Sequence, residues 1–151
     1  MRNAGRLWSG GADVEVEIRP AASLAFSMSY MYNRSRVVDA PGQPQLVGKF
    51  NRQSPVHQGV FEATYVNRRI ARITTDVRVL GRRFEDDINT IGIAPFVSVD
   101  LHVARSVSEK LTAFVTAQNL LNRLNELTHT DDGIYSVTGP RQMNAGLRLR
   151  F

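Results

Sequence analysis

Apolar and polar residues alternate without a break over the last eleven residues of this chain, 141–151. In an extended strand, side chains two residues apart point to the same side of the backbone. One side of this segment is therefore apolar and ends on Phe151, and the other is polar and carries Arg148 and Arg150. Such a strand needs an apolar environment on one side and water on the other.

The same alternation recurs upstream and predicts an all-β fold, an antiparallel meander of about seven strands. The upstream segments span 12–19, 23–32, 58–65, 71–79, 97–104 and 111–118. Short turns near 20–22, 67–69 and 106–110 alternate with long polar loops near 34–54, 82–93 and 122–140. Strands of roughly eleven residues, at ~3.3 Å per residue and a tilt of ~40°, rise roughly 28 Å, which nearly matches the hydrocarbon core of a bilayer.

Composition leaves a membrane barrel open and argues against a helical membrane protein. The 151 residues are 42% hydrophobic, and no run approaches the ~18 consecutive apolar residues of a membrane helix. A barrel strand needs an apolar residue only at every second position. Outer-membrane barrels also have short turns at one end and long loops at the other, so the pattern favours a transmembrane β-barrel.

The two faces of the strands predict what surrounds each of them. Charges of both signs stay ionised only in water or in pairs, so we expect the polar face to line a wide, wet lumen. The lumen-facing candidates are Glu15, Glu17, Asp76, Arg78, Asp100, His102, Arg148 and Arg150. The lipid-facing candidates are Val14, Val16, Phe26, Met28, Val77, Val99, Leu101, Val115, Leu147 and Leu149.

Aromatic residues near the strand ends are consistent with interfacial girdles. Tyr65 and Phe151 would lie near one membrane interface, and Trp8, Tyr30 and Tyr32 near the other. The ordinary preference of aromatic residues for strands explains the same positions equally well.

Periodicity does not say which face is inside, so two alternatives stay open. A soluble ligand-binding β-barrel would place the polar face outside and an apolar cavity within. A free-standing small outer-membrane barrel is the other alternative. An open seven-stranded sheet in lipid, however, would leave two unpaired edges, and each unpaired backbone group would cost several kcal/mol. Single-chain bacterial barrels, moreover, have an even number of strands. The strand count therefore predicts a piece of a larger barrel.

Nothing in the composition indicates nucleic-acid binding. The net charge of +5 comes from arginines spread along the chain rather than from a clustered basic patch. Cysteine is absent, which removes disulfides, zinc clusters and thiol nucleophiles from consideration. The first residues, Met1–Arg6, lack the apolar core of a signal peptide, so an exported protein would need its signal elsewhere.

Candidate catalytic and metal-binding residues are sparse. His57, His102 and His129 have no second ligand at metal-binding spacing, and the acidic run 85–87 is typical of a solvated loop. Ser98, Asp100 and His102 share a face, but residues i and i+2 of a strand lie roughly 6 to 7 Å apart, too far for a direct proton relay. We expect no enzyme, no cofactor and no metal site.

Several motifs, in this order and spacing, resemble the carboxyl-terminal third of the barrel of TonB-dependent outer-membrane receptors. They are Asn3–Arg6 before the strand containing 14–17, Gly81–Asp87 with Asn89, Val99–Leu101, Phe114–Asn122 with its Gln-Asn-Leu-Leu-Asn, and Gly139–Arg141 through Gly146–Phe151. The resemblance extends from about residue 3 to residue 151.

The resemblance implies a 22-stranded barrel in the bacterial outer membrane, plugged by an amino-terminal domain. Such receptors take up iron-siderophores, haem or cobalamin with energy relayed through TonB. The whole chain, 1–151, would be the carboxyl-terminal barrel segment, without plug or signal peptide and unable to transport alone. Its partners would be outer-membrane lipid, the rest of the receptor, and the outer-membrane assembly machinery, which would read Phe151 as an assembly signal.

Overall fold

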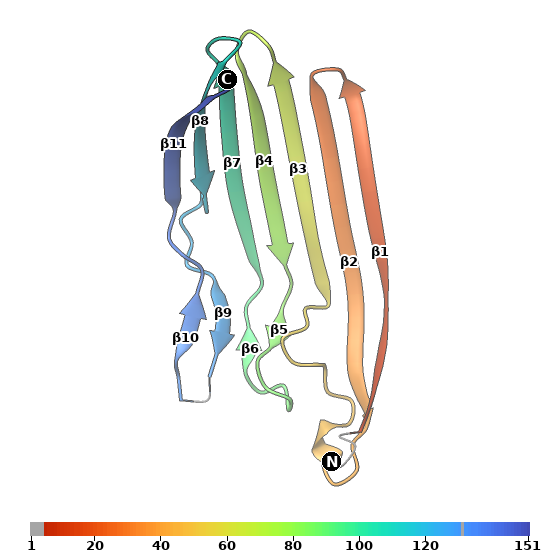
Figure 1. Cartoon of the computed structure of the whole chain (residues 1–151). Coiled ribbons are helices and arrows are strands. Elements are labelled where there is room, and N and C mark those ends of the chain that lie inside the picture. Colours follow the sequence, from red (N-terminus) through yellow and green to blue (C-terminus); the bar gives the residue numbers. More distant parts are fainter. Residues whose placement is uncertain (1–4, 131) are drawn as a thin grey trace.

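The computed structural model describes residues 5–130 and 132–151. These residues form seven long strands (Figure 1): β1 (Arg6–Ala21), β2 (Leu24–Asp39), β3 (His57–Asn67), β4 (Ala71–Leu80), β7 (Phe96–Ser106), β8 (Leu111–Gln118) and β11 (Gln142–Leu149). The long loops hold the 3-10 helix η1 (Pro44–Leu46) and the short strands β5 (Arg83–Phe84), β6 (Gly92–Ile93), β9 (Glu126–His129) and β10 (Tyr135–Val137). Asn3 and Ala4, with which the first of the motifs begins, lie outside the described residues.

The long strands form one antiparallel sheet in the order β1-β2-β3-β4-β7-β8-β11, which confirms the predicted seven-stranded meander. Its short turns, 22–23, 68–70 and 107–110, lie together at one end, and its long loops, 40–56, 81–95 and 119–141, lie at the other (Figure 1). The sheet is open, because β1 and β11 stand at its two edges and are not paired with each other.

Local chemistry explains the tight turn between β3 and β4. The Asn67 side-chain oxygen accepts hydrogen bonds from the backbone nitrogens of Arg69 (2.9 Å) and Ile70 (3.2 Å). An asparagine that bonds to the backbone two and three residues ahead substitutes for the missing strand partner and reverses the chain. The turn therefore forms where the sequence places it.

The first hairpin is longer than the alternation predicts. β1 begins at Arg6 rather than near residue 12, and β2 continues to Asp39 rather than ending near residue 32. Gly10 and Gly11 interrupt the alternation in this extension, and a Cβ at Gly10 would lie 2.7 Å from the Trp8 ring. The glycine is required because the indole lies over it.

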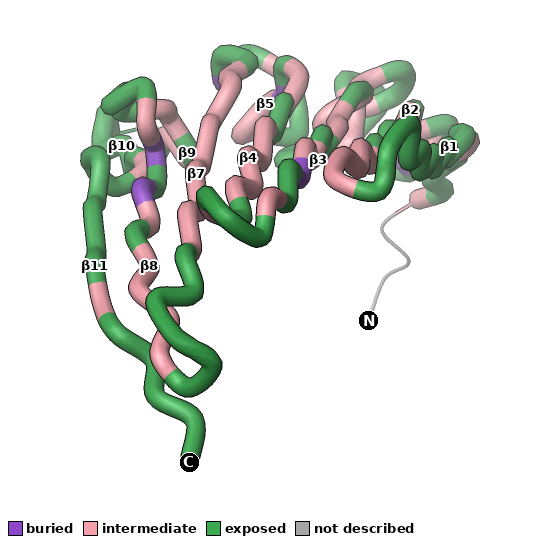
Figure 2. The backbone as a smooth tube through the Cα atoms, turned by 90° about the horizontal axis from the view of Figure 1, so that it is seen from above, coloured by how far each residue is buried: buried purple, intermediate pink, exposed green. Residues whose placement is uncertain are grey.

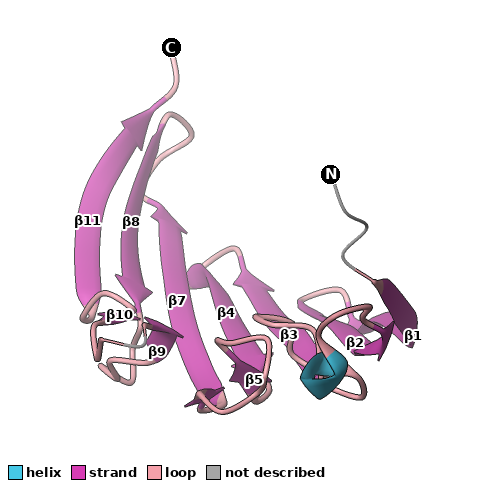
Figure 3. Cartoon of the chain, turned by 90° about the horizontal axis from the view of Figure 1, so that it is seen from below, coloured by secondary structure: helices cyan, strands magenta, loops and turns pink. Residues whose placement is uncertain are grey.

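The sheet curls around one face, so it has a concave and a convex side (Figures 2 and 3). Among the described residues, only Ala40, Ile93 and Ala117 are buried hydrophobic side chains. The chain exposes 10919 Å², whereas a compact soluble monomer of this mass exposes roughly 7,700 Å². The sheet thus lacks a hydrophobic core of its own, and other surfaces must cover its two faces.

No helix among the described residues has both the length and the apolar character needed to cross a membrane.

Candidate functional site

Strand register separates the apolar residues from the polar ones across the whole sheet. Directly paired residues share a face, and the chain of pairs Val16–Met28–Phe61–Val77–Val99 is apolar throughout. By the same register, the ten residues predicted to face lipid all lie on one face of the sheet. The residues predicted to face the lumen, from Glu15 to Arg148, lie on the other face. Arg150 lies just beyond β11, and its backbone nitrogen donates to the Lys110 carbonyl at 2.9 Å, which continues the strand pairing.

The polar face is concave and carries a row of carboxylates. Glu17 pairs with Ser27, Ser27 with Glu62, Glu62 with Asp76, and Asp76 with Asp100, so one row crosses five strands. Like charges directly opposite each other on neighbouring strands repel and are destabilising. Such a row persists only where water or cations compensate the charge, which matches the expectation of a hydrated surface.

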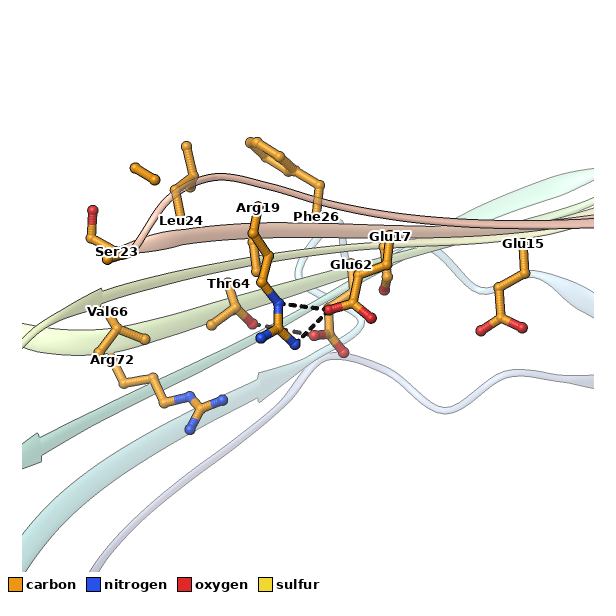
Figure 4. Close-up of a pocket in the computed structure, with 14 residues that line it drawn as sticks. Glu15, Glu17, Arg19, Ser23, Leu24, Phe26, Glu62, Thr64, Val66 and Arg72 are labelled. Atoms are coloured by element: carbon orange, nitrogen blue, oxygen red, sulfur yellow. Dashed lines mark hydrogen bonds and ion pairs between the residues drawn. The ribbon is translucent and has the colours of Figure 1, made fainter.

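Arginines compensate part of this row. Arg19 Nε donates to Glu17 at 2.8 Å, and Arg78 forms an ion pair with Asp100. Figure 4 shows Arg19, Glu17 and Glu62 on one side of the sheet and Phe26 on the other. Glu17, Arg19 and Glu62 line a hollow of about 640 Å³ on the concave face, and this mixture of charges is suited to water or a polar protein surface.

Asp100 is fully occupied by structural contacts. One carboxylate oxygen accepts the backbone N–H of Asn119 at 2.8 Å, and the other binds Arg78. His102 stacks on Phe114 with ring centroids 6.3 Å apart. Asp100 therefore holds the start of the 119–141 loop and His102 packs against β8, and no hydrogen bond among the described residues joins Ser98, Asp100 and His102 into a proton relay.

The other histidines and the acidic run also have structural partners. His57 Nδ1 lies 2.7 Å from the Tyr30 hydroxyl, and His129 Nδ1 lies 3.2 Å from a Glu126 oxygen. Burial alone would raise the pKa of Asp86, but hydrogen bonds from the Thr90 and Ile91 backbone and the Thr90 hydroxyl lower it below its usual value. Within the described residues, no group of three or more potential ligands could hold a metal ion.

The long loops are joined side to side, which periodicity did not predict. The Asn89 side chain binds both backbone groups of Phe50: its oxygen accepts the Phe50 N–H at 2.6 Å and its nitrogen donates to the Phe50 carbonyl at 3.0 Å. Gln53 adds a backbone bond to the Phe84 carbonyl (2.7 Å) and a side-chain bond to Glu85 (2.7 Å). Loop 40–56 is thus attached to loop 81–95.

Arg83 attaches loop 81–95 to the third loop. Arg83 is 6% exposed, and its guanidinium donates to the backbone carbonyls of Glu126 (3.3 Å) and Leu127 (2.7 Å) in β9. Burial lowers the pKa of Arg83, while the nearby Glu85 and Glu126 carboxylates raise it. An arginine that satisfies carbonyl groups of a neighbouring hairpin fixes the position of that hairpin.

A stack of four side chains also connects β2 and loop 40–56 with loop 81–95. Arg36 lies 4.3 Å above the Phe50 ring, Phe50 stacks on Phe84 at 6.1 Å, and Arg82 lies 5.4 Å from the Phe84 ring. Cation–π contacts of this kind contribute roughly 0.5–1 kcal/mol at exposed sites. The loops therefore form a continuous layer over one end of the sheet.

Replacing Asn89 with glycine is expected to loosen loops 40–56 and 81–95 together. Asn89 has a positive φ of 58°, so glycine removes the side-chain hydrogen bonds without adding backbone strain. Losing bonds to buried backbone groups costs roughly 1–3 kcal/mol. Hydrogen–deuterium exchange should speed up in both loops, whereas replacing the exposed Asp87 with asparagine should leave both unchanged. Faster exchange confined to 81–95 would show that the loops are not joined.

An open, strongly curved meander with a polar concave face, an apolar convex face and loops at one end defines a segment of a large β-barrel. Three solved structures match this fold over almost the whole chain. They are the ferric yersiniabactin uptake receptor FyuA from Yersinia pestis (17% identity, TM-score 0.87), the siderophore receptor PiuA from Acinetobacter baumannii (12%, 0.85), and the ferric-catecholate import receptor Fiu from E. coli K12 (14%, 0.82). The chain thus resembles part of the barrel of siderophore receptors, as its motifs imply.

The matches cover 99%, 95% and 97% of this chain but only 24%, 22% and 21% of the respective receptors. The chain therefore spans about a quarter of the length of the structures it matches. At these identities the likeness concerns the fold. No protein-family model matches the chain, and no curated protein matches it by sequence.

Proposed function

We propose that this chain is the carboxyl-terminal part of the β-barrel of a TonB-dependent receptor in the bacterial outer membrane. The observation that carries the proposal is the open, curved sheet with an exposed apolar convex face, together with its likeness to segments of uptake-receptor barrels. β1 and β11 each keep one edge without a strand partner among the described residues. Unpaired backbone groups in lipid cost several kcal/mol each, so the rest of the barrel would pair with both edges.

In this proposal the convex face meets lipid and the concave face lines the lumen. The exposed apolar side chains, including Val14, Met28 and Leu147, would lie against acyl chains. The carboxylate row and its arginines would face water or the plug, where charges remain solvated. This orientation assigns the lipid-facing and lumen-facing residues named from the sequence.

The receptor would import a scarce ligand, and a ferric siderophore is favoured over haem or cobalamin because the matching structures are named as siderophore receptors. The chain would supply three of the outer loops, while the plug and the TonB contact would come from the rest of the receptor. Alone it would not transport. We propose no catalysis, since the Asp100 carboxylate, the one acidic group beside Ser98 and His102, is used in structural contacts with Arg78 and Asn119.

Two alternatives receive less support. A soluble ligand-binding barrel needs its apolar face inside, yet here the apolar side chains are exposed, and Phe26 lies on the side of the sheet opposite Arg19 and Glu17 (Figure 4). A free-standing small outer-membrane barrel would need its edge strands to meet, and β1 and β11 lie at opposite edges of the sheet.

The genomic locus tests the proposal directly. We expect the reading frame to continue upstream through a signal peptide, a plug domain and about fifteen further strands, which would complete the 22 strands that the resemblance implies. Deleting that frame should abolish uptake of one radiolabelled ferric siderophore by iron-starved cells, and the intact gene should restore it. An intact locus without the upstream frame would contradict the proposal and favour a free-standing protein.

A further inference from the structure

The outer end of the convex face, next to the long loops, carries a cluster of aromatic side chains. The Tyr30 hydroxyl bonds to His57 at 2.7 Å, and the Tyr32 and His57 rings lie 5.3 Å apart. Trp8 lies farther along β1, with its indole over Gly10. Aromatic rings with polar atoms favour the boundary between hydrocarbon and headgroups, so this cluster would mark the outer interface of the membrane.

Two arginines lie on the same face, beyond Tyr30 and Tyr32 on β2 and next to Trp8 on β1. The register pairs Arg34 with Gly10 and Arg36 with Trp8, without a shift between them and Tyr32. The alternation therefore places both arginines on the convex side, roughly 6 to 7 Å apart. Gly10, which pairs with Arg34, has no side chain, and the Trp8 indole lies over it, so this ring lies next to Arg34. Arg34 itself is exposed.

Neither arginine is neutralised by a carboxylate. No ion pair between described residues includes Arg34 or Arg36; the nearest pair along the strands joins Arg6 to Asp39 at 3.4 Å. The Arg36 guanidinium is held over the Phe50 ring at 4.3 Å, and its Nε is buried without a hydrogen-bond partner. Two positive charges therefore lie on one face without a carboxylate beside them, and an anion between them would compensate both.

An apolar recess lies toward the membrane interior from these arginines. Its floor is Gly59, which pairs with Tyr30 on one side and Val79 on the other, and its volume is about 290 Å³. Met28, Phe61 and Val77 complete its walls. Arg34 lies four residues beyond Tyr30, or about 13 Å along the strand, a distance that an acyl chain lying along the strands spans.

We propose that Arg34, Arg36 and the Gly59 recess form a binding site for one anionic lipid of the outer leaflet. The lipid phosphate lies between the two guanidinium groups, and one acyl chain occupies the recess. Charge and geometry carry this inference: the arginines lie on the convex face at the level of the interfacial aromatic residues, where lipid phosphates lie, and the apolar recess continues from them toward the hydrocarbon. The site rests on the proposed function, because it requires the convex face to meet the outer leaflet.

The test uses the full receptor in nanodiscs of phosphatidylcholine doped with lipid A, a phosphorylated glycolipid with several acyl chains. Native mass spectrometry after release into detergent counts the lipids retained by each receptor. We expect selective retention of lipid A, reduced roughly fivefold by Arg34→Gln and further by adding Arg36→Gln, since each arginine near an anionic lipid surface contributes about this factor. Arg69→Gln, which removes the same charge from the 68–70 turn at the other end of the sheet, should have no effect.

Each remaining outcome overturns the inference. Unchanged lipid A retention in the double variant would show that the two arginines do not bind the lipid. An equal loss in Arg69→Gln would show that only the overall charge of the receptor matters. Equal retention of phosphatidylcholine would show that phosphate charge is not recognised. A receptor that enters the nanodisc but shows any of these results contradicts this inference alone, whereas one that does not enter the bilayer contradicts the proposed function as well.

Discussion

Replacing Leu147 with arginine is expected to destabilise the membrane-inserted receptor by roughly 2–4 kcal/mol, the cost of an arginine at the midplane of a barrel's lipid face. Leu147 is 68% exposed on the convex face and pairs with Ala113. It lies four residues from the end of the chain, or about 10 Å along the membrane normal at a tilt of ~40°. If Phe151 marks the interface, this depth is close to the middle of a ~25 Å apolar band. Equilibrium refolding into lipid bilayers measures the change.

Asn144→Arg is the matched control on the same strand. Asn144 pairs with Thr116 on the concave face, so its replacement adds the same side chain where water is expected. We expect a change within about 0.5 kcal/mol, as for an ordinary surface substitution. Equal damage from both variants would contradict the assignment of lipid to the convex face and would favour a dry interior instead.

The alternation predicted the membrane-length part of the sheet well because each strand has two different environments. The ends of β3, β4, β7 and β8 lie within a few residues of the predicted ones. The prediction was too short for the first hairpin, where Gly10, Gly11, Arg34 and Arg36 interrupt the apolar–polar order. Backbone pairing continues there although the apolar–polar alternation is interrupted.

The contacts between the loops could not be predicted from periodicity. β5 and β6 have two residues each, too few for a pattern to be recognised, and their position depends on Gln53 in a different loop. Asn89 and Arg83 are the sequence features that could have indicated these contacts. Asn89 has a positive φ, Arg83 lies inside a loop, and both side chains bind backbone groups. Only the three-dimensional arrangement shows which backbone groups those are.

The division of residues between the two faces was predictable, whereas the arrangement of charges within the polar face was not. Alternation assigns Glu62, Asp76 and Asp100 to one face, but only the register shows that they lie directly opposite one another. A shift of one residue in any strand would have moved its charges to the convex face. The carboxylate row is thus a property of the strand pairing rather than of any single segment.

The chain ends on Phe151, which is fully exposed at 111% and lies just beyond β11. The Arg150 backbone still bonds to the Lys110 carbonyl at 2.9 Å, so the alternation of β11 continues to the last residues. A terminal aromatic that contacts nothing contributes little to the stability of its own sheet. We propose instead that Phe151 serves recognition during assembly, in which a partner strand would pair with the free edge of β11.

Deleting Phe151 is therefore expected to lower the amount of the full receptor in the outer membrane severalfold. The free energy of unfolding of molecules that are already inserted should stay within about 0.5 kcal/mol of wild type. The double variant Arg150→Phe, Phe151→Arg keeps the composition and moves the ring by one position, which turns it toward the concave face. It should impair assembly as strongly as the deletion. Quantitative immunoblots of outer-membrane fractions, combined with refolding of the purified variants, separate the two effects. Normal outer-membrane levels of both variants would rule out Phe151 as an assembly signal, and a loss of stability equal to the loss of abundance would reduce its role to packing.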